Sequence, residues 1–174
     1  MSKLNFYIFR GVSHEWLKSY LSERNQITVI DGITSSSSSI SHGVPQGSVL
    51  GPLLFLIFIN YLSNSSSLFK FILFADDSTL STSFAEENAL EFILTLNNEL
   101  TNVNNWLQSN SISINADETK YMIFPYRKQL HLTNIKIGSA TKEETNDIKF
   151  LGIIFDKHLT FKHHVDVIAR STTY

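Results

Sequence analysis

The chain has 174 residues, 43% of them apolar, with a formal net charge of −2 and no cysteine. This length and apolar content suit one ordinary folded domain with a hydrophobic core. The near-neutral charge argues against a stand-alone nucleic-acid binder with a broad cationic surface. The lack of cysteine excludes disulfide bonds and cysteine-ligated zinc.

The sequence contains no pattern typical of secretion or membrane insertion. The N-terminal residues MSKLNFYIFRG lack the apolar run of a secretory signal. The longest apolar run, residues 49–59, is interrupted by Gly51 and Pro52 and is far shorter than the roughly 20 residues that span a bilayer. We therefore expect an intracellular protein, nuclear or cytoplasmic, with no membrane partner.

The first forty residues combine a helical pattern with a strand pattern. Apolar residues at helical spacing indicate an amphipathic helix: Trp16, Leu17, Tyr20 and Leu21. The following segment QITVIDG alternates β-branched residues and predicts a strand. The serine run 35–39 cannot pack in a core, so we interpret it as the tip of a hairpin.

The middle of the chain predicts a buried helix and then a hairpin. Residues 43–62 begin with glycine and proline and become apolar on all sides, which is typical of a loop leading into a buried helix. Residues 69–75 predict a fully buried strand and residues 78–84 its returning partner. Asp76 and Asp77 then lie at the hairpin tip.

The second half predicts one long helix followed by strands. Between residues 86 and 110, apolar side chains recur every three or four positions and predict a helix that packs on the sheet: Ala89, Ile93, Leu96, Leu100, Val103 and Leu107. The segment ISINADETKYMIF predicts a strand, a turn and a strand, and IKIG and DIKFLGIIFD predict further strands before a short helix from about Phe161. The expected fold is α+β, with a largely antiparallel sheet covered by helices on one face.

The two adjacent aspartates call for a compensating cation. Two carboxylates beside apolar strands repel each other, and a divalent metal ion relieves that repulsion. Carboxylate oxygens suit Mg²⁺, which takes one or two protein carboxylates together with substrate phosphates. This is the ligand set of two-metal phosphoryl transfer, although an Asp-Asp pair alone is equally typical of a turn. The adjacent His163 and His164 point to different sides of the expected helix, so we do not expect them to bind metal.

Four segments together resemble a known family. GVPQGSVLGPLLFLIFIN, FADDSTL, NADETKYMIF and FLGIIFDKHLTFKHHV are similar, in this order and at similar spacing, to the reverse transcriptase palm of non-LTR (LINE-type) retrotransposons. The resemblance covers nearly the whole chain. It implies a partial polymerase palm and, in the complete enzyme, RNA-directed DNA synthesis by two-metal nucleotidyl transfer.

The resemblance also implies roles for individual residues. Asp76 and Asp77 match the catalytic, metal-binding pair, which would use Mg²⁺ or Mn²⁺. The other matching positions form a loop against the incoming nucleotide and template base and a hairpin that grips the primer; they are Pro45, Gln46 and Gly47 for the loop, and Phe150, Leu151 and Gly152 for the hairpin. The implied partners of the complete enzyme are an RNA template, a DNA primer and deoxynucleoside triphosphates.

Three departures from the family pattern bear on activity. Glu118 stands where the family usually has a lysine, which leaves Lys120 as the candidate cation beside the leaving pyrophosphate. Tyr61 stands where an aspartate is common. The family's first metal-binding aspartate belongs to a strand that would precede Met1, and the fingers and a full thumb are also lacking. We therefore expect weak metal binding and an inactive fragment, or alternatively a non-catalytic, domesticated module that binds RNA or protein.

Overall fold

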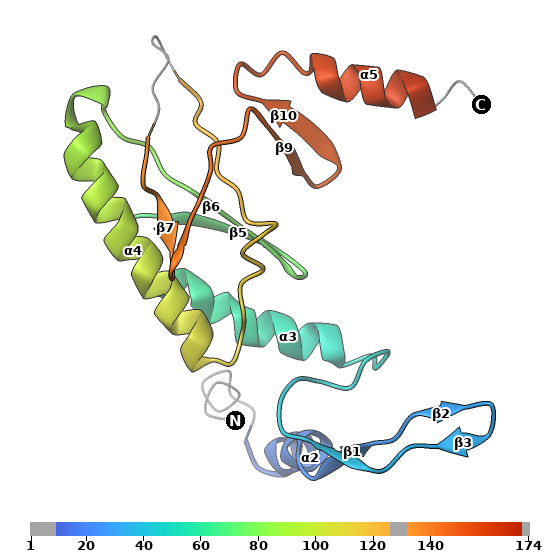
Figure 1. Cartoon of the computed structure of the whole chain (residues 1–174). Coiled ribbons are helices and arrows are strands. Elements are labelled where there is room, and N and C mark those ends of the chain that lie inside the picture. The colour runs from blue at the N-terminus through green and yellow to red at the C-terminus, as the bar shows by residue number, and fades with distance from the viewer. Residues whose placement is uncertain (1–9, 126–131, 172–174) are drawn as a thin grey trace. The chain divides into compact units, whose positions relative to one another are not determined.

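The computed structural model describes residues 10–125 and 132–171 (Figure 1). These residues form two compact units. The first unit contains residues 10–64 and 71–80, and the second contains residues 65–70, 81–125 and 132–171. Helices alternate with short antiparallel hairpins, which confirms the α+β prediction. None of the helices in these ranges is long and apolar enough to cross a bilayer.

The first unit begins with a helix and a two-part β-ribbon. Helix α2 (Val12–Leu21) buries Leu17, while Trp16 stacks on Tyr20 with their ring centroids 5.6 Å apart. Four strands form the ribbon, in which β1 pairs with β4 and β2 with β3: β1 (Arg24–Gln26), β2 (Val29–Ile30), β3 (Ile33–Thr34) and β4 (Ser38–Ile40). The tip of this ribbon is the turn between β2 and β3. The serine run is therefore not the tip, because its last residues pair with β1 in the returning strand.

Helix α3 (Gly51–Ile59) follows the glycine and proline loop as expected, and a 3-10 helix, Asn60–Ser65, extends it. The α3 side chain of Leu54 packs with Leu17 of α2 in a small core. The helix is not buried on all sides, because Leu53 and Leu56 are about half exposed. The helix thus has more apolar side chains than the first unit buries.

The hairpin of β5 (Lys70–Phe74) and β6 (Asp77–Ser81) follows. Strand β5 alternates between half-buried and exposed positions, so the prediction of a fully buried strand is wrong. Leu73 of β5 faces α3 across a hollow of about 350 Å³ that Leu56, Ile57 and Ile59 also line. The side chains of Ile72 and Phe74 are exposed.

Helix α4 (Ala89–Ser109) organises the second unit, and a short 3-10 helix, Glu86–Asn88, precedes it. Leu96, Leu100, Val103 and Leu107 are buried, in agreement with the apolar spacing, while Ala89 and Ile93 are half-buried. The helix packs on the hairpin of β7 (Lys136–Ile137) and β8 (Ala140–Thr141) through its contacts with β7.

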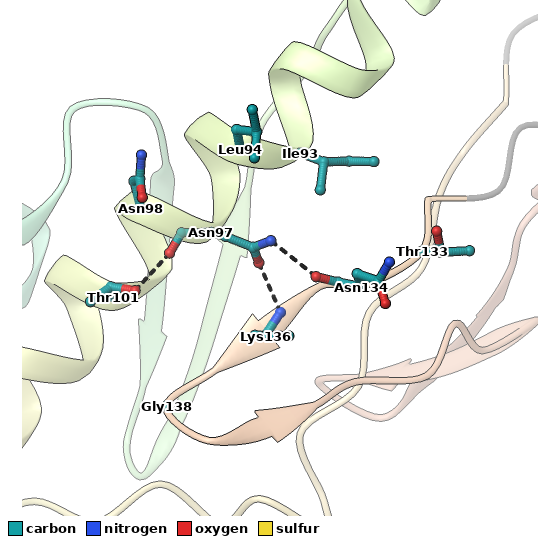
Figure 2. A pocket seen from close by; sticks show the side chains of 9 residues that line it. All are labelled: Ile93, Leu94, Asn97, Asn98, Thr101, Thr133, Asn134, Lys136 and Gly138. Atoms are coloured by element: carbon teal, nitrogen blue, oxygen red, sulfur yellow. Dashed lines mark hydrogen bonds between the residues drawn. The ribbon is translucent and has the colours of Figure 1, made fainter.

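A single amide side chain fastens β7 to α4 (Figure 2). The Asn97 Nδ2 group donates to the Asn134 carbonyl at 3.0 Å, and its Oδ1 accepts from the Lys136 amide at 2.8 Å. The side chain thus satisfies one donor and one acceptor of the neighbouring backbone, as a strand would. A hollow of about 710 Å³, lined by both polar and apolar residues, lies along this junction.

The remaining elements are the hairpin of β9 (Asp147–Phe150) and β10 (Ile153–Asp156) and helix α5 (Lys162–Ser171), as the sequence indicated. The segment ISINADETKYMIF does not form the expected pair of strands. It contains turns and one isolated parallel bridge between Tyr121 and Glu144. Within the described residues the strands form five separate two-stranded sheets in place of the common sheet that we expected.

Candidate metal and nucleotide site

The aspartate pair lies where the sequence predicted it, at the tip of the β5–β6 hairpin. Ala75 and Asp76 form the turn, and Asp77 is the first residue of β6. Ala75 has a φ angle of 50°, a region that residues with a Cβ rarely adopt. The tight turn is therefore strained beside the two carboxylates.

Both carboxylates are exposed. Among the described residues, the side chains of Asp76 and Asp77 have no hydrogen-bond or ion-pair partner, so their oxygens are available to a ligand. Carboxylate oxygens are the type of ligand that a hard divalent cation prefers. No cluster of three or more metal-ligating side chains occurs within the described ranges, so the pair provides an incomplete set of ligands.

The second expected segment, Pro45 to Gly47, forms a reverse turn just before α3. Gln46 and Gly47 are its central residues, and both are exposed. Gly47 has a φ angle of 73°, which the third position of a type II turn requires and which glycine adopts without strain. This turn and the aspartate pair belong to the same compact unit.

The third expected segment is the turn at residues 116–118, in the second unit. Lys120 follows the turn and is exposed. A different lysine contacts the turn itself: Lys142 is only 9% exposed, and its Nζ donates to the Ala116 carbonyl. Sequence reasoning missed Lys142, because it is 26 residues distant and belongs to no recognisable motif.

The expected primer hairpin is the β9–β10 pair. Phe150 lies opposite Ile153, and Leu151 and Gly152 form a two-residue turn between them. The φ angles of these turn residues are 47° and 87°, as a type I′ turn requires. Asparagine and glycine are the usual residues of such a turn, so an exposed leucine with a positive φ angle is unusual.

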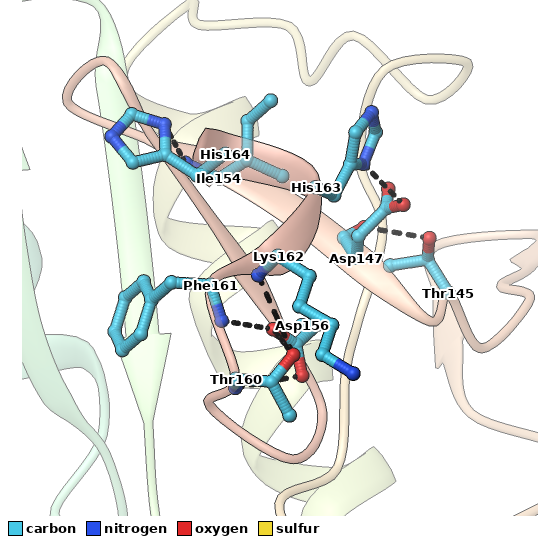
Figure 3. A network of polar contacts seen from close by, with 9 residues as sticks. All are labelled: Thr145, Asp147, Ile154, Asp156, Thr160, Phe161, Lys162, His163 and His164. Carbon is cyan, nitrogen blue, oxygen red and sulfur yellow. Dashed lines mark hydrogen bonds and ion pairs between the residues drawn. The ribbon is translucent and has the colours of Figure 1, made fainter. Parts of the chain in front are cut away.

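A polar network joins this hairpin to α5 (Figure 3). The Asp156 carboxylate accepts hydrogen bonds from the backbone amides of His158, Thr160 and Phe161 and from the Thr160 hydroxyl. These donors, first of all the Thr160 amide, lower the pKa of Asp156 from 3.8 to about 2.

The two histidines of α5 contact the hairpin separately. His163 Nδ1 lies 3.2 Å from Asp147 Oδ2, and the Ile154 amide donates to His164 Nδ1 at 3.4 Å. Both contacts hold the helix to the strands.

An α+β chain that exposes two adjacent carboxylates at a hairpin tip has donors suited to metal-dependent phosphoryl transfer. Sequence comparison identifies the family: the model of the reverse transcriptase (RNA-dependent DNA polymerase) family matches residues 2–155. The chain belongs to the reverse transcriptase family. The resemblance to enzymes of non-LTR retrotransposons is thus confirmed.

The similar curated proteins are polymerases of mobile elements. The chain is 29% identical over 163 residues to the RNA-directed DNA polymerase from mobile element jockey of Drosophila funebris, a match that covers 89% of this chain and 17% of that protein. It is 30% identical over 154 residues to the probable RNA-directed DNA polymerase from transposon X-element of Drosophila melanogaster, covering 86% of this chain and 16% of that protein. The chain therefore spans about one sixth of the length of these relatives. No solved structure matches it significantly.

Proposed function

We propose that the chain is a palm segment of a reverse transcriptase that extends a DNA primer on an RNA template within a longer protein. The observation that carries this proposal is the pair of exposed, unpartnered carboxylates, Asp76 and Asp77, on a tight hairpin turn. Family membership supports it, because the matching relatives are named as RNA-directed DNA polymerases.

Asp76 and Asp77 would hold a divalent ion, Mg²⁺ or Mn²⁺, by their carboxylate oxygens. Such an ion would activate the hydroxyl of the primer and stabilise the negative charge on the transferred phosphate. The contribution of the chain is to fix both carboxylates at the end of a short, strained turn. The position of this turn matters because a displacement of about 1 Å can reduce a rate roughly a hundredfold.

The remaining candidate residues would bind the substrates. The exposed Gln46 amide, beside a glycine that allows close approach, suits hydrogen bonding to the incoming nucleotide or template base. Lys120 would attract the pyrophosphate, and Phe150, Leu151 and Gly152 would contact the primer terminus. Gln46 belongs to the first unit, and Lys120 and the turn at Phe150, Leu151 and Gly152 belong to the second.

Primer extension tests this function. The segment should be inserted in place of the corresponding part of the jockey polymerase and assayed on an RNA template with Mg²⁺ or Mn²⁺. We expect extension by the chimera and its loss in the double variant Asp76→Asn, Asp77→Asn. Asp31→Asn is the matched control, because Asp31 occupies another exposed hairpin tip, in the β2–β3 ribbon of the same unit.

The isolated chain should not extend primers, because two carboxylates alone cannot position two metal ions. Extension by the isolated chain that disappears in the double variant would mean that this segment is itself a minimal polymerase. A chimera that folds and binds the primer–template but retains full extension in the double variant would contradict the role of the aspartates. A chimera that folds and binds the primer–template but does not extend the primer would favour the alternative of a non-catalytic module that binds RNA or protein.

A further inference from the structure

One hydroxyl group connects the Gln46–Gly47 turn, which we propose to bind the nucleotide, to α3. The Ser48 Oγ donates to the Pro45 carbonyl at 2.7 Å and accepts from the Gly51 amide at 3.0 Å. The backbone bond that closes the turn, from the Ser48 amide to the same Pro45 carbonyl, is long at 3.4 Å. The shorter side-chain bond is therefore the stronger closure of the turn.

The same hydroxyl also satisfies the beginning of α3. Leu50 is the N-cap residue and provides no side-chain cap, and the first amide of the helix is that of Gly51. The following residue, Pro52, has no amide hydrogen. Ser48 thus replaces the missing cap from two residues upstream and joins the turn and the helix into one piece.

Gly51 is required for this arrangement for a steric reason. A Cβ atom at Gly51 would lie 2.8 Å from Ser48 Oγ and 3.2 Å from the Pro45 carbonyl oxygen. Both distances are shorter than ordinary contacts, so an alanine would separate the atoms that Ser48 joins. By contrast, a Cβ atom at Gly47 would meet nothing within 4 Å. Gly47 and Gly51 therefore have different tasks, since Gly47 permits the turn and Gly51 permits its attachment to α3.

We propose that Ser48 is a positioning residue: its hydroxyl links the Pro45 carbonyl to the Gly51 amide and thereby holds the turn that carries Gln46 against the beginning of α3. This inference rests on the proposed role of Gln46 in nucleotide binding. Ser48 itself does not have to touch the substrate. It limits the orientations of the exposed Gln46–Gly47 turn, so that less ordering is required when the nucleotide binds.

Amide hydrogen exchange on the isolated chain tests the link without any need for activity. In Ser48→Ala, the Gly51 amide loses its acceptor and should exchange on the order of fivefold faster. The Ser48 amide, which donates to the Pro45 carbonyl of the same turn, should also exchange faster. Ser48→Thr keeps the hydroxyl and should restore protection. Ser63→Ala is the matched control, because the Ser63 hydroxyl also donates to the carbonyl three residues earlier, that of Asn60, at 2.9 Å.

Gly51→Ala attacks the same link from the other side. It should accelerate exchange in the turn although alanine is the better helix former. The double variant Ser48→Ala, Gly51→Ala should be no worse than the more affected single variant, because both changes break one link. Unchanged exchange in Ser48→Ala, or additive effects in the double variant, would overturn the proposal.

In the jockey chimera, Ser48→Ala should raise KM for the incoming nucleotide about tenfold and leave kcat less affected, with recovery in Ser48→Thr. A general loss of folding would instead lower the amount of active enzyme, and with it kcat. If the unmutated chimera is inactive, the proposed function fails, while the exchange experiment still decides whether Ser48 fixes the turn. Normal KM together with accelerated exchange would show that the link does not position Gln46.

Discussion

Two apolar residues have positive φ angles at the turns that carry the candidate site, 50° for Ala75 and 47° for Leu151. A side chain with a Cβ pays roughly 1–2 kcal/mol for this conformation. Such strain persists where the surroundings impose it, and it concentrates at functional sites. Neither angle is visible in the sequence, since alanine and leucine carry no signature of a turn.

Replacing Leu151 by asparagine should separate stability from function. Asparagine tolerates the φ angle of 47° and suits a type I′ turn before Gly152. Leu151→Asn should therefore raise the free energy of unfolding by about 1 kcal/mol, measured in urea. In the chimera it should reduce primer extension if Leu151 contacts the primer as proposed, since the substitution removes the exposed leucine side chain.

Leu159→Asn is the control for this substitution. Leu159 also has a positive φ angle, 55°, and is 50% exposed, compared with 48% for Leu151. It should gain similar stability and leave extension unchanged. Equal losses of extension in both variants would show that Leu151 has no particular role at the primer.

Asp156 gives the second unit a specific acid sensitivity. Its pKa falls from 3.8 to about 2 in the folded chain, mainly because the Thr160 amide donates to the carboxylate. A lowered folded-state pKa stabilises the protein above the unfolded value, and this contribution disappears as the pH falls from about 4 towards about 2.

Urea unfolding at several pH values tests this contribution. Asp156→Asn should be less stable than the unmutated chain near neutral pH, and the difference should shrink across this acid range. Asp166→Asn, on the exposed surface of α5, is the control and should keep a constant difference. A constant difference for Asp156→Asn as well would show that its carboxylate charge does not stabilise the fold.

At the scale of elements, α4 is where sequence and structure agree best. Apolar spacing alone predicted its extent and its buried stripe, because a long amphipathic helix has one consistent way to bury that face. The Asn97 link to β7 could not be predicted, since an asparagine in a helix carries no indication of its distant partner. Likewise, the strands expected around residues 112–124 did not form, although their residues have β-propensity, because pairing depends on context.

The stripe on α4 predicts a contrast between two neighbouring leucines. Leu96 is 7% exposed and Leu94 is 68% exposed on the same helix. Leu96→Ala should cost on the order of 2–5 kcal/mol, because it removes buried methyl groups and leaves a cavity. Leu94→Ala should change the free energy of unfolding by less than about 0.5 kcal/mol. Chemical denaturation of both variants measures this, and equal effects would show that the stripe is not the core.

At the scale of the whole molecule, the sequence was more informative about local turns than about the arrangement of the strands. The Asp76–Asp77 hairpin tip, the Gln46–Gly47 turn and the Leu151–Gly152 turn all formed at the expected positions, because turn chemistry is local. The expected common sheet did not form within the described residues, where the strands pair only two by two. Apolar residues on β5 and α3, such as Phe74 and Leu56, are exposed, although the sequence predicted that both elements are buried. Apolar composition shows which side chains could be buried, and it does not show which of them the fold buries.

Metal affinity tests how far the aspartate pair is sufficient in the chain as a whole. Mg²⁺ gives up its water reluctantly and usually binds through carboxylates together with substrate phosphates. Asp76 and Asp77 supply two exposed carboxylates, and the described residues contain no cluster of three metal-ligating side chains. We therefore expect Mg²⁺ to bind with a Kd weaker than about 1 mM in calorimetry, equivalent to less than about 4 kcal/mol of binding free energy.

Addition of a deoxynucleoside triphosphate should tighten Mg²⁺ binding only if the phosphates complete the ligand set at the pair. This gain should exceed the affinity of the triphosphate alone for Mg²⁺ and should vanish in the double variant Asp76→Asn, Asp77→Asn. The same gain should persist in Asp31→Asn, whose carboxylate lies on the other ribbon tip. Micromolar binding of Mg²⁺ alone that Asp76→Asn abolishes would contradict the prediction. Two carboxylates on one turn cannot provide such an affinity, so a further ligand of this chain would have to complete the site.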